Sequence, residues 1–276
     1  MTRLTDKCSK LVQFARNLQD HGISTLGAQP LEITKPDDVL GLIGKLTPQD
    51  CGRNLIRIGG SGDGGYLIPD DLDGIEYCFS PGVSTVSNFE NELANLNIKS
   101  FLADYSVDSP PIAREEFTFD KKFLGSTDYG QFFTLTSWKD KYLKDYAGDL
   151  ILQMDIEGGE YEVIINTPDH VLDQFRIMVI EFHFLHKLFD PFVFRLFSSC
   201  FEKLLENFYI VHIHPNNCTG SVKISGIEVP RLLEFTFLNK RRVVCTKRQR
   251  IFPHKLDEPC VPGKDLYLPE CWYSEG

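Results

Sequence analysis

The segment that most constrains the fold of this chain is an apolar run that ends in acidic residues and glycines. Residues 149–160 read DLILQMDIEGGE, and the first part of this segment is nearly continuous in apolar side chains. A run without alternating polar residues is typical of a strand buried on both faces of a parallel sheet. Parallel strands need long crossover connections, which are usually helices. The segment therefore predicts an α/β fold.

Strand and helix patterns alternate along most of the chain. The ranges predicted as strands are 75–80, 99–108, 119–125, the start of 149–160, 176–183, 208–215 and 232–240. The helical patterns between them cover 86–96, 134–143, 160–167 and 190–208. This alternation favours a largely parallel sheet. No helix separates the last two strands, so we expect them to form an antiparallel pair.

The two ends of the chain differ from this central pattern. Residues 4–18 place apolar side chains on one helical face, and Pro36 opens a second short helix. Residues 1–50 are therefore predicted to form a helical cap. The domain that contains the sheet is predicted to span 51–250, followed by a tail with prolines and cysteines at 251–276.

A glycine-rich stretch near the start of the domain matches a dinucleotide-binding pattern. Gly60, Gly62 and Gly65 satisfy G-x-G-x-x-G. In a dinucleotide fold, a helix begins at the third glycine and binds the pyrophosphate. Here Gly65 leads into Tyr-Leu-Ile-Pro, and Pro69 would break a helix at once. The stretch therefore predicts a hairpin over 55–69 rather than a nucleotide loop.

A better nucleotide site follows the strand predicted at 75–80. That strand leads into the turn SPGVS (80–84) and then a helix, and the next strand contains Asp104. Open α/β sheets bind ligands beyond the carboxyl ends of their strands, where an acidic residue of the second strand bonds a ribose hydroxyl. The turn has only one glycine, so a nucleoside without phosphates, such as S-adenosylmethionine, fits it better than NAD. An oxidoreductase stays open only if the turn accommodates a pyrophosphate.

Composition limits the class of partner. The 29 basic and 39 acidic residues give a net charge of −10, which disfavours an extended nucleic-acid surface. The longest apolar runs have only the length of strands, so no membrane span is predicted. The start of the sequence lacks the apolar region of a secretory signal, and the eight cysteines lack metal-knuckle spacing. We expect a cytoplasmic protein. The basic cluster at 240–250 indicates either a solvated hairpin or a local phosphate contact.

The chain resembles the FkbM family of S-adenosylmethionine-dependent methyltransferases. The residues that carry the resemblance are SPGVS, Asp104, TLTSW, MDIEGGEYEVI, VIEFH, HIHPNN and LEFTFL, within about residues 50–245. The resemblance implies a class I methyltransferase fold, which is a seven-stranded, mostly parallel sheet with an antiparallel final hairpin. It also implies O-methylation of hydroxyls on sugars and related compounds.

The resemblance also places the cofactor. It implies that the turn lies beside the methionine end of S-adenosylmethionine, that Asp104 binds the ribose, and that residues 124–126 lie near the adenine. The first loop lacks the acidic residue and the several glycines that many class I enzymes carry, so the contact to the cofactor's amino group stays unassigned. The residues predicted to bind the cofactor are Ser80, Pro81, Gly82, Val83, Asp104, Tyr105, Gly125, Ser126 and Asp155.

Methyl transfer to oxygen needs a group that makes the acceptor hydroxyl more nucleophilic. Asp155, His183 and His214 end successive predicted strands and are the catalytic candidates. One interpretation is a divalent ion (Mg, Mn or Fe) that lowers the pKa of the alcohol, and another is a metal-free histidine base. In a third interpretation these side chains are purely structural. The residues of the metal interpretation are Asp155, Glu181, His183 and His214.

The acceptor is predicted to be a sugar or nucleotide-sugar. Arg57, Asp63 and Tyr66 of the hairpin are expected to close over the site, and Asp63 is a candidate partner for Arg57 if that strand is buried. The remaining substrate candidates are Glu157, Asn216 and Asn217. Alternative functions are methylation of an amine or another small metabolite, and cofactor binding without catalysis. The oligomeric state is left open, and a homodimer is compatible with the sequence.

Overall fold

The central element is a seven-stranded sheet. The computed structural model describes residues 32–274, so the helix predicted at 4–18 lies outside the described residues. The strands are β4 (Tyr77–Pro81), β5 (Lys99–Ala103), β6 (Phe117–Asp120), β9 (Leu150–Met154), β10 (Phe175–Phe182), β11 (Phe208–Pro215) and β14 (Leu233–Asn239).

The strand order is β11-β14-β10-β9-β4-β5-β6. Strand β14 is antiparallel to both of its neighbours, while the pairs from β10 to β6 are parallel. This arrangement confirms the predicted class I methyltransferase fold, including the antiparallel final pair.

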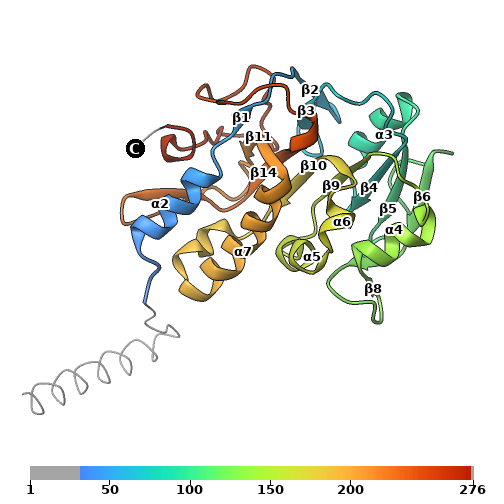
Figure 1. Ribbon diagram of the computed structural model, residues 1–276, viewed down its shortest axis with the longest axis horizontal. Helices are drawn as coiled ribbons and strands as arrows, with labels where there is room; N and C mark the ends of the chain where they lie inside the picture. The colour runs from blue at the N-terminus through green and yellow to red at the C-terminus, as the bar shows by residue number, and fades with distance from the viewer. Residues whose placement is uncertain (1–31, 275–276) are drawn as a thin grey trace, which may run out of the picture.

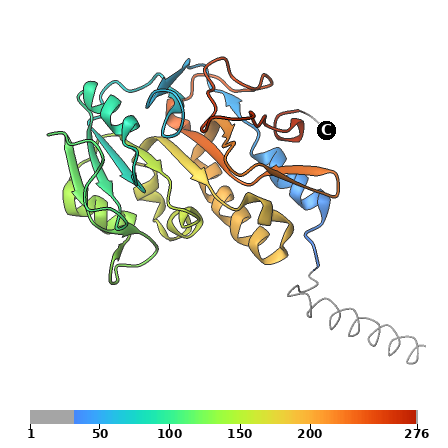
Figure 2. The same cartoon turned by 180° about the vertical axis from the view of Figure 1, so that it is seen from behind.

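Helices cover one face of the sheet, and a hairpin with one helix covers the other (Figures 1 and 2). The helices on the first face are α2 (Pro36–Lys45), α4 (Leu135–Leu143), α5 (Glu160–Asn166), α6 (Asp169–Leu172) and α7 (Pro191–Asn207). The second face carries α3 (Asn88–Asn95) and the hairpin of β2 (Leu55–Ile58) and β3 (Tyr66–Pro69). We refer to it as the hairpin face.

The strands bury side chains on both faces. In β9, Leu152 packs into the core beneath the helices, whereas its neighbour Ile151 packs beneath the hairpin. Strand β10 repeats the pattern with Ile180 and Val179. Successive side chains of a strand point to opposite faces, so a strand covered twice must be apolar at nearly every position. This explains the continuous run with which the sequence signals the fold.

The glycine-rich stretch forms the predicted hairpin. Strands β2 and β3 pair antiparallel from Leu55 opposite Pro69 to Ile58 opposite Tyr66. Gly59 has a φ of 99°, and a Cβ atom there would lie 2.1 Å from the carbonyl oxygen of Gly64. The glycines therefore allow the two ends of the loop 59–65 to approach closely, and no helix begins at Gly65.

Three segments differ from the sequence prediction. The third strand of the sheet is β6, which ends at Asp120 instead of continuing to 125, and Phe123–Leu124 form the separate short strand β7 beside β8 (Phe132–Phe133). Strand β5 stops at Ala103 rather than near 108. The loop predicted between the last two strands contains the hairpin of β12 (Ser221–Ile224) and β13 (Ile227–Pro230). Its two turn residues both have positive φ, as a tight hairpin turn requires.

The tail wraps around β11, which is an edge strand of the sheet. On the hairpin face, the Asp257 carboxylate lies 2.8 Å from Nε2 of His212. On the helical face, the fully buried Trp272 packs against Phe235. Trp272 belongs to the short helix η3 (Glu270–Trp272), which contacts α2. The tail thus covers an edge that would otherwise be open to pairing with another strand.

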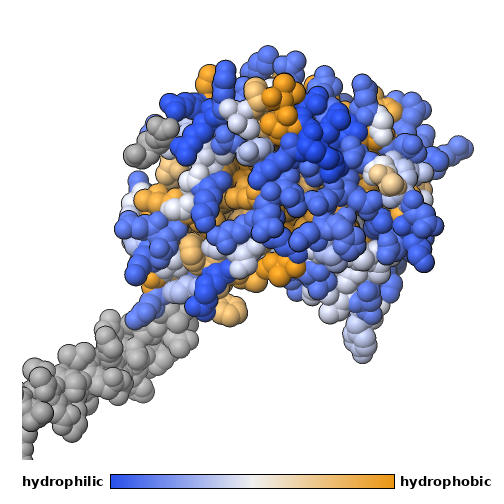
Figure 3. All heavy atoms as spheres, in the orientation of Figure 1, coloured by the Kyte–Doolittle hydropathy of each residue, from blue (hydrophilic) through white to orange (hydrophobic). Residues whose placement is uncertain are grey.

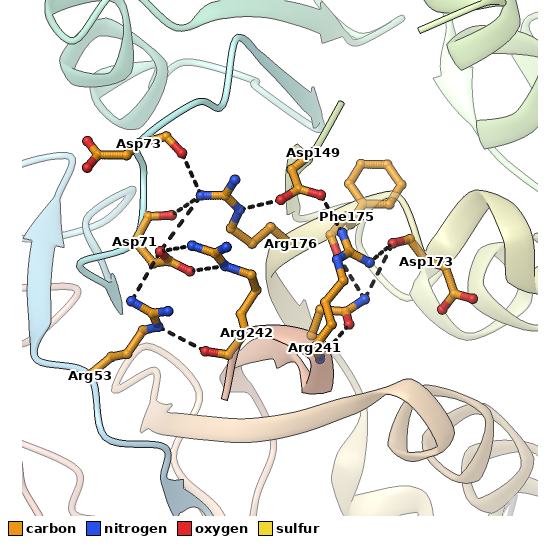
Figure 4. A network of polar contacts seen from close by, with 10 residues as sticks. Arg53, Asp71, Asp73, Asp149, Asp173, Phe175, Arg176, Arg241 and Arg242 are labelled. Carbon is orange, nitrogen blue, oxygen red and sulfur yellow. Dashed lines mark hydrogen bonds and ion pairs between the residues drawn. The ribbon is translucent and has the colours of Figure 1, made fainter. Parts of the chain in front are cut away.

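An ion-pair network lies at the end of the sheet where β9 and β10 begin and β14 ends (Figure 4). Arg242 donates to both carboxylate oxygens of the buried Asp71, at 2.8 and 2.6 Å. Arg176 bonds Asp149 at 2.6 Å, and Arg241 bonds the same carboxylate at 2.6 Å. Two arginines of the basic cluster therefore pair with carboxylates of the protein, which the sequence interpretation did not include, while Lys247 and Arg248 of the same cluster are exposed to solvent.

The surface seen in Figure 3 is mostly hydrophilic, with small separate hydrophobic groups. Within residues 32–274, every helix is too short or too polar to cross a bilayer. The longest described helix, α7, has 17 residues and lays Phe197, Phe201 and Leu204 against the sheet.

Candidate functional site

The turn after β4 lies at the switch point of the sheet, where the chain leaves β4 toward β5 on one side while β9 lies on the other. Gly82 has a φ of 88°, and its N–H donates to the carbonyl of Ala103 at 2.9 Å. A Cβ atom on Gly82 would lie 1.5 Å from the carbonyl oxygen of Asp155. The turn is therefore pressed against the ends of β5 and β9, and only glycine fits there.

A cavity of about 150 Å³ opens beside this turn. Its walls come from the turn and α3, from the end of β9 and from the hairpin, which contributes the predicted Asp63 and Tyr66. Four of its lining side chains are acidic: Asp63, Glu90, Asp155 and Glu157. Carboxylates gathered around one cavity favour a cationic ligand.

The cofactor candidates Asp104, Tyr105, Gly125 and Ser126 do not line this cavity. Asp104 is buried, and its carboxylate accepts from the N–H of Ser84 at 2.8 Å and from the N–H of Ser106 at 2.7 Å. It therefore holds the turn in place. Tyr105 is half exposed beside Phe123. The last two candidates follow β7, where Gly125 donates to the carbonyl of Phe133 and the hydroxyl of Ser126 lies 3.2 Å from Glu162.

A buried chain of hydrogen bonds runs behind the cavity. The hydroxyl oxygen of Ser80 lies 2.5 Å from Oε1 of Glu90 and 2.8 Å from Oε1 of Gln153, and Nε2 of Gln153 donates to the hydroxyl of Tyr66 at 3.3 Å. A hydroxyl has one proton, so Ser80 cannot donate to both oxygens. The chain closes if protonated Glu90 donates to Ser80 and Ser80 donates to Gln153. Burial raises the pKa of Glu90, in agreement with this arrangement.

Glu90 was missed in the sequence because its position suggests another role. Ser87 and Glu90 have the spacing of a helix capping box. In the structure, the side chain of Ser87 caps nothing, and Glu90 turns into the protein.

Replacing Glu90 with glutamine is expected to stabilise the protein at pH 8 and to change little at pH 4. The folded state raises the pKa of this carboxyl above its ordinary 4.5, so the folded state binds more protons than the unfolded state between the two values. Stability is therefore lost as the pH rises through that window. Glutamine removes the loss and still donates to Ser80, so the Tm at pH 8 is expected to rise.

Thermal unfolding followed by circular dichroism at the two pH values measures this effect. The exposed Glu76, replaced in the same way, is the matched control and is expected to show no such difference. An equal shift of Glu90→Gln at pH 4 and pH 8 would contradict a protonated Glu90.

His183 follows β10 and is buried against Glu160. Its Nδ1 lies 3.1 Å from Oε1 of Glu160, an oxygen that also accepts the N–H groups of Ile156 and Gly158 at 3.1 Å each. A carboxylate oxygen in this position makes Nδ1 the protonated nitrogen, which leaves Nε2 as the acceptor. Burial lowers the pKa of His183, but the bond to Glu160 and the nearby carboxylates outweigh burial and raise it above 6.5.

Three carboxylates surround the free nitrogen of His183. Nε2 lies 3.3 Å from Oε2 of Glu157, 3.8 Å from Oδ1 of Asp155 and 3.8 Å from Oε1 of Glu181. Burial, partly offset by His183, raises the pKa of Asp155 to about 7. A hydroxyl or a cation placed among these atoms would be held from several sides.

The same donor atoms suit a divalent ion. Ligands bound at 2.0–2.2 Å stand about 3–4 Å apart, and Nε2 of His183 lies 3.8 Å from a carboxylate oxygen of Asp155 and of Glu181. The described ligand atoms here that all lie within 4.8 Å of one another belong to Asp155, Glu160 and His183, a group that does not include Glu181. Oδ1 of Asp155 is buried and has no hydrogen-bond partner. His214 does not belong to this group. Within the described residues, the ring of His214 lies close to Glu234 and Cys260 and also to His212 and Asp257. The four predicted metal ligands therefore belong to two separate clusters.

The separation follows from the strand register. On the hairpin face, Glu181 of β10 stands opposite Glu234 of β14, and Glu234 stands opposite His214 of β11. His214 is therefore two strands away from Glu181. Burial and the neighbouring carboxylates raise the pKa of Glu181 well above its ordinary value.

Two predicted substrate contacts are already engaged within the protein. Arg57 donates to the carbonyls of Gly60 and Gly62, at 2.6 and 3.2 Å, instead of pairing with Asp63. Asn217 exchanges two hydrogen bonds with the backbone of Val261, at 2.8 and 3.0 Å, and thereby fastens the tail. Asn216 differs, because its amide nitrogen lies 3.4 Å from both oxygens of Glu181, at the edge of the site.

One family model matches a part of the chain that is less than half of its length. Residues 133–208 match the family described as the methyltransferase FkbM domain, a range that includes Asp155, Glu160 and His183. No curated protein matches the chain. Two solved structures are similar at low identity. One is a fibrillarin/Nop5p complex (13% identity, TM-score 0.37, covering 61% of this chain and 74% of that one). The other is the Methanococcus jannaschii fibrillarin pre-rRNA processing protein (12%, TM-score 0.35, 68% and 82%). The fold assignment depends on the strand order and not on these two matches.

Proposed function

Because residues 133–208 carry an FkbM methyltransferase domain, we propose that the protein transfers the methyl group of S-adenosylmethionine to a hydroxyl of a sugar or nucleotide-sugar. The catalytic unit in this proposal is the domain of residues 51–250, with the tail packed on it.

One observation carries the proposal. Asp155 and Glu157 line the acidic cavity beside the β4 turn, and the same two carboxylates face Nε2 of His183. S-adenosylmethionine has a cationic ammonium and a cationic sulfonium, so an acidic cavity at the switch point suits it. A donor bound there would have its methyl group on the side of the imidazole, where an acceptor can meet both.

The proton of the acceptor hydroxyl then moves to a residue of the chain. The acceptor hydroxyl gives its proton to Nε2 of His183 as its oxygen attacks the methyl carbon. The C–S bond breaks with its electron pair on sulfur, which leaves neutral S-adenosylhomocysteine and a methyl ether. Glu160 fixes the ring through Nδ1 and stabilises the imidazolium that forms, as a carboxylate does behind other catalytic histidines.

A metal-assisted variant uses the same atoms differently. Asp155, Glu181 and Nε2 of His183 would hold a divalent ion of the Mg, Mn or Fe class, which would lower the pKa of a bound hydroxyl. In that variant Nε2 cannot accept a proton, and Glu157 would be the base beside it. Activity that survives treatment with a chelator favours the histidine base. Activity that is lost and restored by one of these ions favours the metal.

A second acceptor class is an amine. The row formed by the partly buried Asp155 and the buried Glu181 and Glu234 is acidic and would attract an ammonium group, as in an amino sugar. Hydroxyls are favoured as acceptors because the carboxylates can accept from a polyol and Asn216 at the site edge can donate to it. A hydroxyl is also neutral, unlike an ammonium group, and so adds no positive charge beside the cationic donor.

The test uses purified protein with methyl-labelled S-adenosylmethionine and a panel of nucleotide-sugars, free sugars and amino sugars. We expect label in a methyl ether, with an equal amount of S-adenosylhomocysteine. Transfer only to the nitrogen of amino sugars would replace the first acceptor class by the second. Tight binding of the cofactor without transfer to any acceptor would indicate a binding protein instead of an enzyme.

A further inference from the structure

A second cluster of metal-ligand side chains lies where the tail crosses the sheet. Nitrogen, oxygen and sulfur atoms of His214, Glu234 and Cys260 all lie within 4.8 Å of one another. His214 comes from β11, Glu234 from β14 and Cys260 from the tail. Sγ of Cys260 lies 3.0 Å from Oε1 of Glu234, and both residues are buried. The cluster shares no residue with Asp155, Glu181 and His183.

Within this cluster, the ring of His214 lacks a hydrogen-bond partner, whereas Glu234 and Cys260 bond each other. Both ring nitrogens of His214 are shielded from solvent and have no hydrogen-bond partner. Oδ1 of Asp257 lies 3.7 Å from Nδ1, too far for a hydrogen bond, because it bonds Nε2 of His212 at 2.8 Å. A buried polar group without a partner costs about 1–3 kcal/mol. Glu234 is also buried, and it stands opposite Glu181 on the neighbouring strand. The two carboxylates repel each other when both are charged.

The donor set selects one kind of ion. A thiolate, an imidazole and a carboxylate are the three ligand types of zinc, whereas magnesium and calcium take oxygen ligands. Zinc ligands stand about 3–4 Å apart, so the three side chains need only small rotations to bind one ion. The Asp257 carboxylate, beside His214, is the nearest further oxygen.

We propose that His214, Glu234 and Cys260 bind a zinc ion that fastens the tail to the sheet. On binding, the Cys260 thiol releases its proton to solvent, and the sulfur forms a bond to zinc. The ion neutralises Glu234 and gives the His214 ring its missing partner.

Neighbouring contacts hold the same stretch of tail. The carbonyl of Leu256 lies 3.5 Å from Nη1 of Arg57, and Val261 is fastened to Asn217. Zinc would thus bind Cys260 in a tail segment that is already held at Leu256 and at Val261. This role does not depend on methyl transfer, because His214 lies two strands from Glu181 and because neither His214 nor Cys260 takes part in the proposed proton transfer.

The test measures metal content and sulfur ligation in the full chain. Wild type is loaded with zinc, dialysed and analysed for metal, together with Cys260→Ser and His214→Ala. Cys218→Ser, an exposed cysteine, and His183→Ala, at the other cluster, are the controls. We expect Cys260→Ser and His214→Ala each to hold one equivalent of zinc fewer than wild type, and Cys218→Ser to hold as much as wild type. His183→Ala is expected to lose zinc only from the other cluster, if that cluster binds any. A chelator is expected to lower the Tm of wild type and of the controls but not of Cys260→Ser.

Cobalt substitution reports the sulfur directly and needs no variant. Cobalt-loaded wild type is expected to show a near-ultraviolet thiolate-to-cobalt charge-transfer band that Cys218→Ser keeps. The absence of this band in wild type overturns the proposal, even if Cys260→Ser fails to fold. Full zinc content in Cys260→Ser overturns it as well.

Discussion

Replacement of His183 by alanine is expected to lower kcat by about 100- to 10,000-fold, the contribution usual for a positioned acid or base. The ring is the one described imidazole whose Nδ1 is fixed by a buried glutamate while its Nε2 faces the acidic cavity wall. Its removal leaves the β4 turn and Asp104 untouched, so the affinity for S-adenosylmethionine is expected to change by less than about threefold. Initial rates and calorimetric titration of the cofactor separate the two quantities.

The matched control is His186→Ala. His186 is half-buried in the short helix η1 (Leu185–Phe189), away from the cavity, and its loss is expected to leave kcat within about twofold. A near-normal rate in His183→Ala would exclude this histidine as the base and would shift attention to Asp155, whose pKa of about 7 also suits proton transfer.

Gly82→Ala is expected to have the second largest effect, through the cofactor. The new Cβ would meet the carbonyl oxygen of Asp155 at 1.5 Å, so the turn or the end of β9 must move. Displacement of about 1 Å near a reacting centre costs about 100-fold in rate, and we expect kcat/KM for S-adenosylmethionine to fall by at least that much. Titration of the cofactor is expected to show weaker binding as well.

Gly74→Ala separates the collision from the backbone strain. Gly74 has a φ of 77°, similar to that of Gly82, but nothing lies within 4 Å of its Cβ position. Both variants carry the cost of a side chain in the left-handed region, about 1–2 kcal/mol. Only Gly82→Ala is expected to lose cofactor affinity. If the two variants bind the cofactor equally well, the β4 turn is not the cofactor loop.

The order and type of the main strands could be predicted from the sequence because their patterns are local. The apolar run before Asp155 signals burial on both faces, and Pro69 excludes a helix after the glycines. The hairpin at 221–230 was missed because each of its strands has only four residues, so the alternation of Val222 with Ile224 and of Ile227 with Val229 is too short to stand out from a loop. The early end of β6 was missed because the strand pattern continues into β7, which pairs elsewhere.

The site could be predicted only in part, because several of its contacts depend on pairing between distant segments. Asp155 and His183 could be found because strand ends of a parallel sheet meet at one edge. Glu234 carries no signal of its own, since it lies in an apolar strand and gains its neighbours only through the register with β10 and β11. Cys260 and Asp257 come from the tail, whose path no local pattern reveals.

The position of β14 has a consequence for synthesis of the protein. Strand β14 lies between β10 and β11, although it is made after both. While the chain emerges from the ribosome, β11 has no place in the sheet until β14 is complete, and the edge of β10 stays open. An unpaired apolar edge is prone to aggregation, so nascent chains that stop between about residues 215 and 239 are expected to depend on chaperones. Translation past Asn239 then lets both strands join in one step, followed by the tail.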